Sequence, residues 1–148
     1  MITVEKFAKE HVPFAAKIEK ECFSAPWSEN ALESELENEN ARFYVAFVDG
    51  EAAGYFGMHV VCGEGYVANI AVDKKFRRLG VAGALLNKAA EENKMSFISL
   101  EVRKSNAPAI SFYKKHGFET VGERKKFYSN PSEDAFIMTK YFKNQEKV

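Results

Sequence analysis

The sequence predicts a mixed α/β domain, and three observations support this fold class. The chain has 148 residues, of which 46% are hydrophobic and 14% aromatic, enough to bury one ordinary core and too apolar for intrinsic disorder. Two tight-turn sequences, Asp49-Gly50 and Cys62-Gly-Glu-Gly65, join three β-rich segments and predict three consecutive antiparallel strands. Beyond Asp73 the apolar period becomes helical. We therefore expect a single domain over residues 1–148.

Local signals then place the elements in order. An apolar stripe at helical spacing predicts the first helix, and Ser28 resembles the N-cap of a second, acidic one. Asn106 and Pro108 open the last helix, which Gly117 ends. The expected strands are Ile2–Phe7, Phe43–Val48, Glu51–Val61, Tyr66–Val72, Phe97–Val102, Glu119–Tyr128 and Ala135–Phe142, and the expected helices run over residues 10–23, 29–36, 80–94 and 107–116.

Composition excludes several classes of function. Lys+Arg and Asp+Glu number 21 each, so no basic excess favours direct binding to nucleic acid. Two cysteines and three scattered histidines offer neither a disulfide framework nor metal-ligand spacing, so no metal is expected. No signal peptide and no membrane-spanning run is recognised, which predicts a cytoplasmic protein without a membrane partner.

The charges are divided unevenly along the chain. Residues 1–72 hold five basic and twelve acidic residues, a net −7, whereas residues 73–148 hold sixteen and nine, a net +7. This asymmetry suggests two partner surfaces, one for a cation and one for an anion. A solvated surface with no partner is the alternative.

The segment Arg77-Arg-Leu-Gly80-Val-Ala82 follows a predicted strand and opens a predicted helix. Gly80 and Ala82 let the backbone approach a ligand, while Arg77, Arg78 and the free N–H groups of the helix end favour an anion such as pyrophosphate. Neither a Walker loop nor a dinucleotide-binding glycine motif is present. Because glycine is common near helix starts, an ordinary turn remains the alternative.

Motifs on both sides of this loop resemble the GNAT superfamily of N-acetyltransferases. Asn69-Ile-Ala-Val72 and Arg77-x-x-Gly80-x-Ala82 are similar to its acetyl-CoA motif, and Leu100-Glu-Val102 with Ser105-Asn106, Phe112-Tyr113 and Gly117-Phe118 is similar to the second half of its core. The resemblance implies the GNAT fold: a mixed, mostly antiparallel sheet of six to seven strands, splayed central strands and four helices on both faces. It also implies acetyl-CoA as cosubstrate.

Three further segments resemble one subgroup, the RimI-type ribosomal-protein alanine N-acetyltransferases. They are Phe23-Ser-Ala-Pro-Trp27-Ser-Glu29, Leu100-Glu-Val-Arg103-x-Ser-Asn106, and Tyr128 followed by Glu133-Asp-Ala135. The subgroup acetylates the N-terminal alanine of a small-subunit ribosomal protein, which is therefore the expected acceptor. Two positions depart from the common pattern, since Gln is frequent where Arg77 stands and Gly where Ala82 stands.

The resemblance also implies residue roles. Glu101 would be the general base that deprotonates the acceptor amine, and Tyr113 the general acid that protonates the CoA thiolate. Without the resemblance, Glu101 reads as an exposed carboxylate at a strand end and Tyr113 as core packing. The remaining implied CoA contacts are Asn106, which is also a helix cap, the backbone of Ile70, Ala71 and Val72, and the loop residues Arg77, Arg78, Leu79, Gly80, Val81 and Ala82.

For the acceptor, Pro26 and Trp27 on one side and Tyr128 and Glu133 on the other are expected to line a peptide groove. The acidic run Glu29–Glu39 would attract a cationic N-terminus, although a solvated helix face is the alternative. Another protein N-terminus, a lysine or a small metabolite could also be the acceptor, and a non-catalytic acyl-CoA-binding module is the other class. We expect a monomer or a weak dimer.

Overall fold

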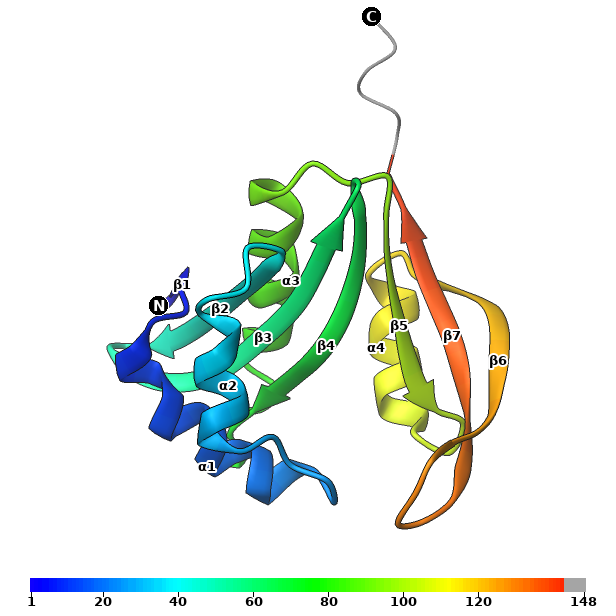
Figure 1. Ribbon diagram of the computed structural model, residues 1–148, viewed down its shortest axis with the longest axis horizontal. Coiled ribbons are helices and arrows are strands. Elements are labelled where there is room, and N and C mark those ends of the chain that lie inside the picture. The colour runs from blue at the N-terminus through cyan, green and yellow to red at the C-terminus, as the bar shows by residue number, and fades with distance from the viewer. Residues whose placement is uncertain (143–148) are drawn as a thin grey trace, which may run out of the picture. The chain divides into compact units, whose positions relative to one another are not determined.

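A computed structural model describes residues 1–142; residues 143–148 of the expected domain lie outside the described residues. Its strands form one sheet in the order β1-β2-β3-β4-β5-β7-β6 (Figure 1). The expected mostly antiparallel α/β fold is confirmed, with seven strands in the described part. The elements are β1 (Ile2–Lys6), η1 (Lys9–His11), α1 (Val12–Cys22), α2 (Glu29–Glu35), β2 (Ala41–Val48), β3 (Glu51–Val61), β4 (Glu64–Val72), η2 (Lys74–Phe76), α3 (Val81–Glu92), β5 (Phe97–Arg103), α4 (Ala107–Lys115), β6 (Glu119–Tyr128) and β7 (Glu133–Tyr141).

Several element boundaries differ from the sequence prediction: β2 begins at Ala41 and β7 at Glu133, each two residues earlier than expected, and α3 ends at Glu92. Two further differences have identifiable reasons. β4 begins at Glu64 rather than at Tyr66, because Cys62 and Gly63 alone make the turn, with φ of 51° and 76°. Two consecutive positive φ values fit the two-residue turn that best matches strand twist. α1 begins at Val12 after a short 3₁₀ turn, with a proline in its first turn where the missing N–H costs nothing.

The described chain forms two compact units. The N-terminal unit comprises Met1–Val60 and Ala68–Lys94, and the C-terminal unit comprises Val61–Val67 and the described residues from Met95 onward. The N-terminal unit therefore holds β1 to β3, the end of β4 and α1 to α3, whereas the start of β4 and everything from β5 onward belong to the C-terminal unit. Within residues 1–142, no helix is long and apolar enough to cross a membrane.

Helices cover the sheet of the N-terminal unit on two faces: α1 and α2 lie on one side of β2 and β3, and α3 lies on the other (Figure 1). Consequently the six residues from Ala53 to Met58 of β3 are all buried, without the alternation of a half-exposed strand. Ile18 of α1, Leu32 of α2 and Leu85 of α3 are also fully buried. This core fixes the strand ends that carry the predicted CoA-binding backbone.

In the C-terminal unit, β5 pairs with β7 along its whole length, and β7 in turn pairs with β6. Burial alternates along β5, so that Ile98, Leu100 and Val102 share the buried face while Glu101 lies on the other. At its start, β5 pairs in parallel with Glu64–Tyr66 of β4. Glu101 is thus held by a strand whose backbone is bonded to β7 before and after it.

Candidate active site

The loop before α3 presents backbone N–H groups, as the sequence predicts. Gly80 caps the helix with φ of 89°, and Arg78 also has a positive φ, 66°. A Cβ added to Gly80 would meet no atom within 4 Å, so conformation rather than crowding requires the glycine. The first helical hydrogen bond runs from Ala84 N to Gly80 O, at 3.0 Å. The N–H groups of residues 81–83 precede that bond and favour an anion at the helix end.

The Arg77 side chain is directed at the protein itself. Its Nε donates to the backbone oxygen of Val72 at 3.2 Å, and its Nη2 donates to Cys22 Sγ at 3.5 Å. Burial raises the pKa of the Cys22 thiol, and the positive charge of Arg77 partly opposes that shift. Arg77 therefore links the end of β4 to the end of α1, a contact that the sequence did not predict. Its contact with a CoA phosphate stays a prediction.

Close packing fixes the part of β4 expected to bind the pantetheine arm. A Cβ on Gly54 of β3 would lie 2.8 Å from the backbone oxygen of Ala71, so only glycine allows this approach. The N–H of Asp73 donates to Ala53 O at 2.8 Å, just past the strand end. The pairing of Ile70, Ala71 and Val72 with a pantetheine arm remains a prediction.

A buried carboxylate, Glu19 of α1, lies behind these strands and was missed by sequence reasoning. Its side chain is fully buried and accepts three hydrogen bonds: from the Trp27 backbone N–H at 2.8 Å, from Asn69 Nδ2 at 2.7 Å and from the Tyr55 hydroxyl. Burial raises the pKa of Glu19, while the bonds from Tyr55 and Trp27 act in the opposite direction. Glu19 therefore connects α1, the segment before α2, β3 and β4.

One sequence signal could have revealed this group. Glu19 occupies the apolar stripe of α1, next to Ile18, where a carboxylate is seldom found without partners. The partners could not be identified because Tyr55 and Asn69 are 36 and 50 residues away along the chain.

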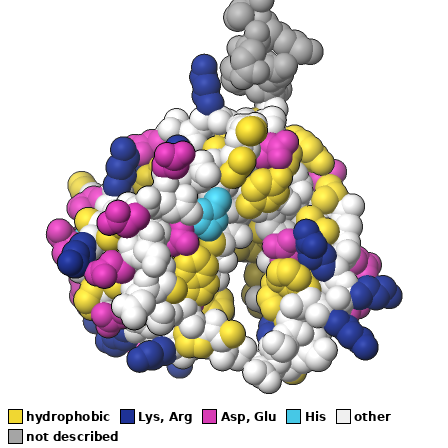
Figure 2. All heavy atoms as spheres, viewed as in Figure 1, with side chains coloured by type: hydrophobic (Ala, Val, Ile, Leu, Met, Phe, Trp, Pro, Cys, Tyr) yellow, Lys and Arg dark blue, Asp and Glu magenta, His cyan; other side chains and the backbone are white. Residues whose placement is uncertain are grey.

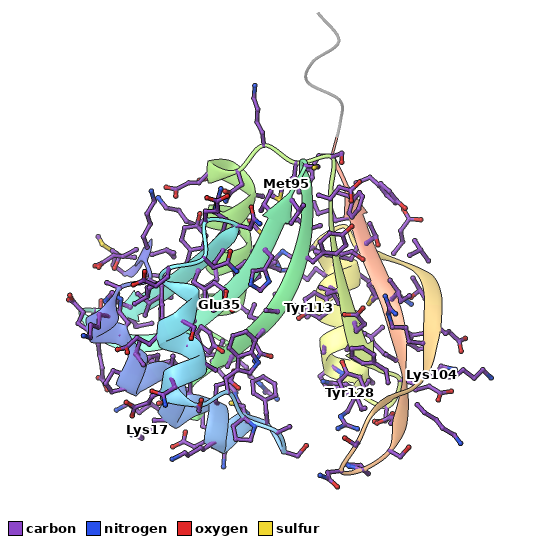
Figure 3. All side chains as sticks on the ribbon, viewed as in Figure 1. Lys17, Glu35, Met95, Lys104, Tyr113 and Tyr128 are labelled. Carbon is purple, nitrogen blue, oxygen red and sulfur yellow. The ribbon has the colours of Figure 1, made fainter. Side chains whose placement is uncertain are left out.

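The residues expected on the acceptor side of the N-terminal unit lie before and along α2. Pro26 is exposed, and the Trp27 ring is partly buried against Phe43, with ring centroids 6.1 Å apart. Ser28 caps α2 by accepting from Ala31 N, as expected. Most of the acidic run is exposed, and acidic side chains are visible over the face of Figure 2. Glu35, labelled in Figure 3, is instead 2.8 Å from His59 Nε2.

In the C-terminal unit, the predicted base Glu101 has a cationic partner. Arg124 of β6 donates from Nε to Glu101 Oε2 at 3.0 Å. The Glu101 side chain keeps 27% of its surface accessible. A carboxylate with one oxygen engaged and part of its surface open can accept a proton from a ligand.

Tyr113 and Tyr128 lie in the same unit as Glu101 (Figure 3). Burial raises the pKa of Tyr128 to about 12, and the nearby charge of Glu101 adds to that shift. Tyr113 is buried on α4; burial raises the pKa of its hydroxyl well above its usual range, and Tyr128 adds to the effect. Three predicted site residues are thus close enough to influence one another: Glu101 acts on Tyr128, and Tyr128 acts on Tyr113. Tyr113 stays protonated at neutral pH, as a proton donor must.

Glu133, expected to contact the acceptor, is engaged within the protein. Its Oε2 accepts from the Ser105 backbone N–H at 2.6 Å, and its Oε1 lies 3.3 Å from Arg103 Nη1. Contacts with Ser105 and Arg103 hold the pKa of Glu133 below its usual range. Its contact with an acceptor stays a prediction.

Arg103 organises the connection between β6 and β7. It donates to Pro131 O at 2.9 Å and to Ser129 O at 3.2 Å, and its guanidinium carbon lies 4.4 Å from the centre of the Tyr128 ring. Arg103 belongs to the motif that suggested the RimI subgroup, yet no role was predicted for it from the sequence. The structure shows that it holds the segment carrying Tyr128.

Asn106 caps α4, as predicted, since its Oδ1 accepts from Ala109 N at 3.2 Å. Its second expected role, contact with CoA, stays a prediction. Within residues 1–142, no group of three or more His, Cys, Asp or Glu side chains is placed to hold a metal ion.

Comparison with known proteins identifies the family. Residues 12–118 match the acetyltransferase (GNAT) family. The chain belongs to the GNAT acetyltransferase family. This acetyltransferase is 33% identical over 143 residues to the [ribosomal protein bS18]-alanine N-acetyltransferase of Escherichia coli K12, covering 93% of this chain and 96% of that one. It is also 38% identical over 119 residues to an N-alpha-acetyltransferase of Sulfurisphaera tokodaii, covering 70% and 71% of the two chains.

A solved structure confirms the GNAT fold. The crystal structure of the ribosomal-protein-S18-alanine N-acetyltransferase from Escherichia coli matches with a TM-score of 0.87 and 32% identity, covering 95% of this chain and 94% of that one. The chain is therefore an N-acetyltransferase similar to RimI-type enzymes. GNAT acetyltransferases use acetyl-CoA as the acetyl donor.

Proposed function

We propose that this acetyltransferase transfers the acetyl group of acetyl-CoA to the N-terminal alanine of a small-subunit ribosomal protein. The observation that carries the proposal is its end-to-end similarity to the Escherichia coli enzyme named for bS18-alanine acetylation, over 93% of this chain. The Glu101 and Tyr113 side chains, with the chemistry described above, support it. We infer that the acceptor is an amine because the chain belongs to this acetyltransferase family. We infer that it is a ribosomal protein from the name of the Escherichia coli relative.

In this proposal the loop from Arg77 to Ala82 binds the CoA phosphates, and the backbone of β4 from Ile70 to Val72 binds the pantetheine arm. Glu101 removes one proton from the acceptor ammonium. An α-amino group has an ordinary pKa of about 7.7–8.0, so this deprotonation costs little near neutral pH. The carboxylate is poised for it because Oε2 is held by Arg124 while the side chain remains partly accessible.

The freed amine nitrogen then forms a bond to the acetyl carbonyl carbon, and the bond from that carbon to sulfur breaks. Tyr113 first donates a hydrogen bond, and then its hydroxyl proton, to the departing sulfur. The nitrogen loses its second proton as the amide forms, and because burial raises the pKa of Tyr113, the tyrosinate readily takes up a proton in its place. Glu101 finally releases its proton to solvent, so that one proton is set free per turnover and both side chains regain their starting states.

Two peptides test the acceptor. One begins with Ala and carries basic residues; the other has the same sequence with a blocked N-terminus and free lysines. We expect acetyl-CoA consumption only with the free Ala terminus. Equal turnover of both would identify lysine side chains as acceptors, and no turnover with either would favour a metabolite acceptor or a non-catalytic acyl-CoA-binding module.

The base is tested separately by Glu101→Gln. This isosteric change removes proton-accepting capacity and retains the shape of the side chain. Turnover should fall by about a hundredfold or more, while acetyl-CoA affinity measured by calorimetry persists. Unchanged turnover would remove Glu101 from this role.

A further inference from the structure

We infer that Arg124 is a positioning residue for the base: it holds Glu101 Oε2, so that Oε1 is the atom that receives the proton of the acceptor. This inference rests on the proposed function, because it acts through Glu101. It concerns a residue that neither the motifs nor the expected GNAT roles include.

The register of the sheet explains how Arg124 reaches Glu101 across a strand. On β7, Glu101 is opposite Ile137 and Arg103 is opposite Ala135, while Arg124 of β6 pairs with Ala135 from the other side. Arg124, Ala135 and Arg103 therefore lie side by side in one row across the sheet. Glu101, two residues before Arg103 on β5, lies on the same face of the sheet as this row. The small side chain of Ala135 leaves room above β7 for the guanidinium to cross diagonally.

Within residues 1–142, Arg124 is the one cationic side chain that is hydrogen-bonded to Glu101. Arg103, on the same face, is committed to Glu133 and to the Ser129 and Pro131 backbone oxygens. The other described groups near Glu101 bring no free positive charge: Ile137 opposite Glu101 is uncharged, Tyr128 is neutral at pH 7, and Glu123 is paired with Lys104. Tyr113, whose pKa is raised by burial and by Tyr128, is also neutral. Arg124 therefore supplies the direct positive charge on Glu101.

The geometry makes the two carboxylate oxygens unequal. The bond from Arg124 Nε to Oε2 is 3.0 Å long, and within the described residues Oε1 accepts no hydrogen bond. A charge-assisted bond of this kind restricts rotation of the carboxylate. Arg124 is itself 56% exposed, so it can hold Glu101 without filling the space that an acceptor needs.

Substitutions at Arg124 separate the hydrogen bond from the charge. Arg124→Gln keeps a donor and removes the charge, whereas Arg124→Lys keeps the charge and removes the planar guanidinium. For Arg124→Gln we expect kcat to fall about tenfold because the carboxylate is less well oriented. KM for the alanine peptide should change little, because Arg124 orients the base and does not contact the peptide.

Arg124→Lys keeps the charge but loses the Nε donor that holds Oε2, so kcat should recover only in part. The matched control is Lys125→Gln, which removes the same charge from the neighbouring exposed position of β6 and should change neither kcat nor KM. Thermal melting and acetyl-CoA binding should be the same for all variants, which checks folding. Wild-type kcat in Arg124→Gln would overturn the inference, and so would an equal effect of Lys125→Gln.

A double variant distinguishes this inference from the proposed function. If Arg124 acts through Glu101, adding Arg124→Gln to Glu101→Gln should cause no further loss of kcat. A further tenfold loss would show that Arg124 acts elsewhere and would overturn the inference. By contrast, full activity of Glu101→Gln alone would refute the base assignment itself, whatever Arg124→Gln does.

Discussion

Replacing Tyr55 by Phe removes one of the three donors of the buried Glu19 carboxylate and almost nothing else. Both side chains are fully buried, and the Tyr55 ring packs against Phe7 and Phe43, which Phe can also do. The bonds from Trp27 and Asn69 to Glu19 are retained. The substitution therefore isolates the contribution of a single hydroxyl.

Its magnitude follows from the charge of the acceptor. A hydrogen bond to a charged group contributes about 1.5–3 kcal/mol, and its loss leaves a buried carboxylate less well solvated. We expect the free energy of unfolding to fall by about 2 kcal/mol. For a domain of this size that corresponds to a decrease in Tm of roughly 4–8 °C.

The assay is urea unfolding at pH 7, followed by circular dichroism, with Tyr44→Phe as the matched control. Tyr44 is also buried in the N-terminal unit, but its hydroxyl accepts from the neutral amide of Asn93 at 3.0 Å, and the carboxylate near it, Glu92, is accessible to solvent and paired with Lys88. That control should lose about 1 kcal/mol or less. If Tyr55→Phe costs no more than Tyr44→Phe, Glu19 does not depend on its hydroxyl as described and the reasoning fails.

Three further predictions concern pH dependence, loop order and capping. Burial raises the pKa of Glu19 above its unfolded value, so its contribution to stability is largest below about pH 4.3 and decreases as pH rises through the folded pKa. Glu19→Gln should remove that decrease, and parallel stability–pH curves for the two proteins would contradict it. Arg103→Met frees the segment that carries Tyr128, so steady-state kinetics should show KM for the alanine peptide raised severalfold with a smaller change in kcat. An unchanged KM would show that this segment takes no part in acceptor binding. Asn106→Ala should lose about 1 kcal/mol in urea unfolding and Asn106→Asp much less, since Asp also caps helices; equal losses would argue against the cap.

Local chemistry made most elements predictable. The hairpin at Asp49-Gly50 and the cap at Ser28 depend on neighbours in sequence, so residue type alone identifies them. The same holds for the N–H groups before α3, because Gly80 must adopt a positive φ there. The roles of Glu101 and Tyr113 came from motif resemblance, which locates residues but not their partners.

Long-range pairing was not predictable. The position of β7 between β5 and β6 depends on which strand is buried: Ala135 and Met138 of β7 are fully buried, whereas β6 is almost wholly exposed. Similarly, the direction of the Arg77 side chain depends on Val72 and Cys22, which no local pattern connects to it. The three donors of Glu19 come from separate segments for the same reason.

The exposed strand β6 has a consequence for solubility and for directed evolution. It is a terminal strand of the sheet, and a free strand edge invites pairing with another molecule unless charges discourage it. Glu123, Arg124, Lys125 and Lys126 supply those charges along four consecutive exposed positions. Arg124 is also bonded to Glu101, the proposed base, so substitutions that remove its charge should lower turnover and weaken this protection against aggregation at the same time. Turnover and soluble yield should therefore fall together when the charge at Arg124 is removed.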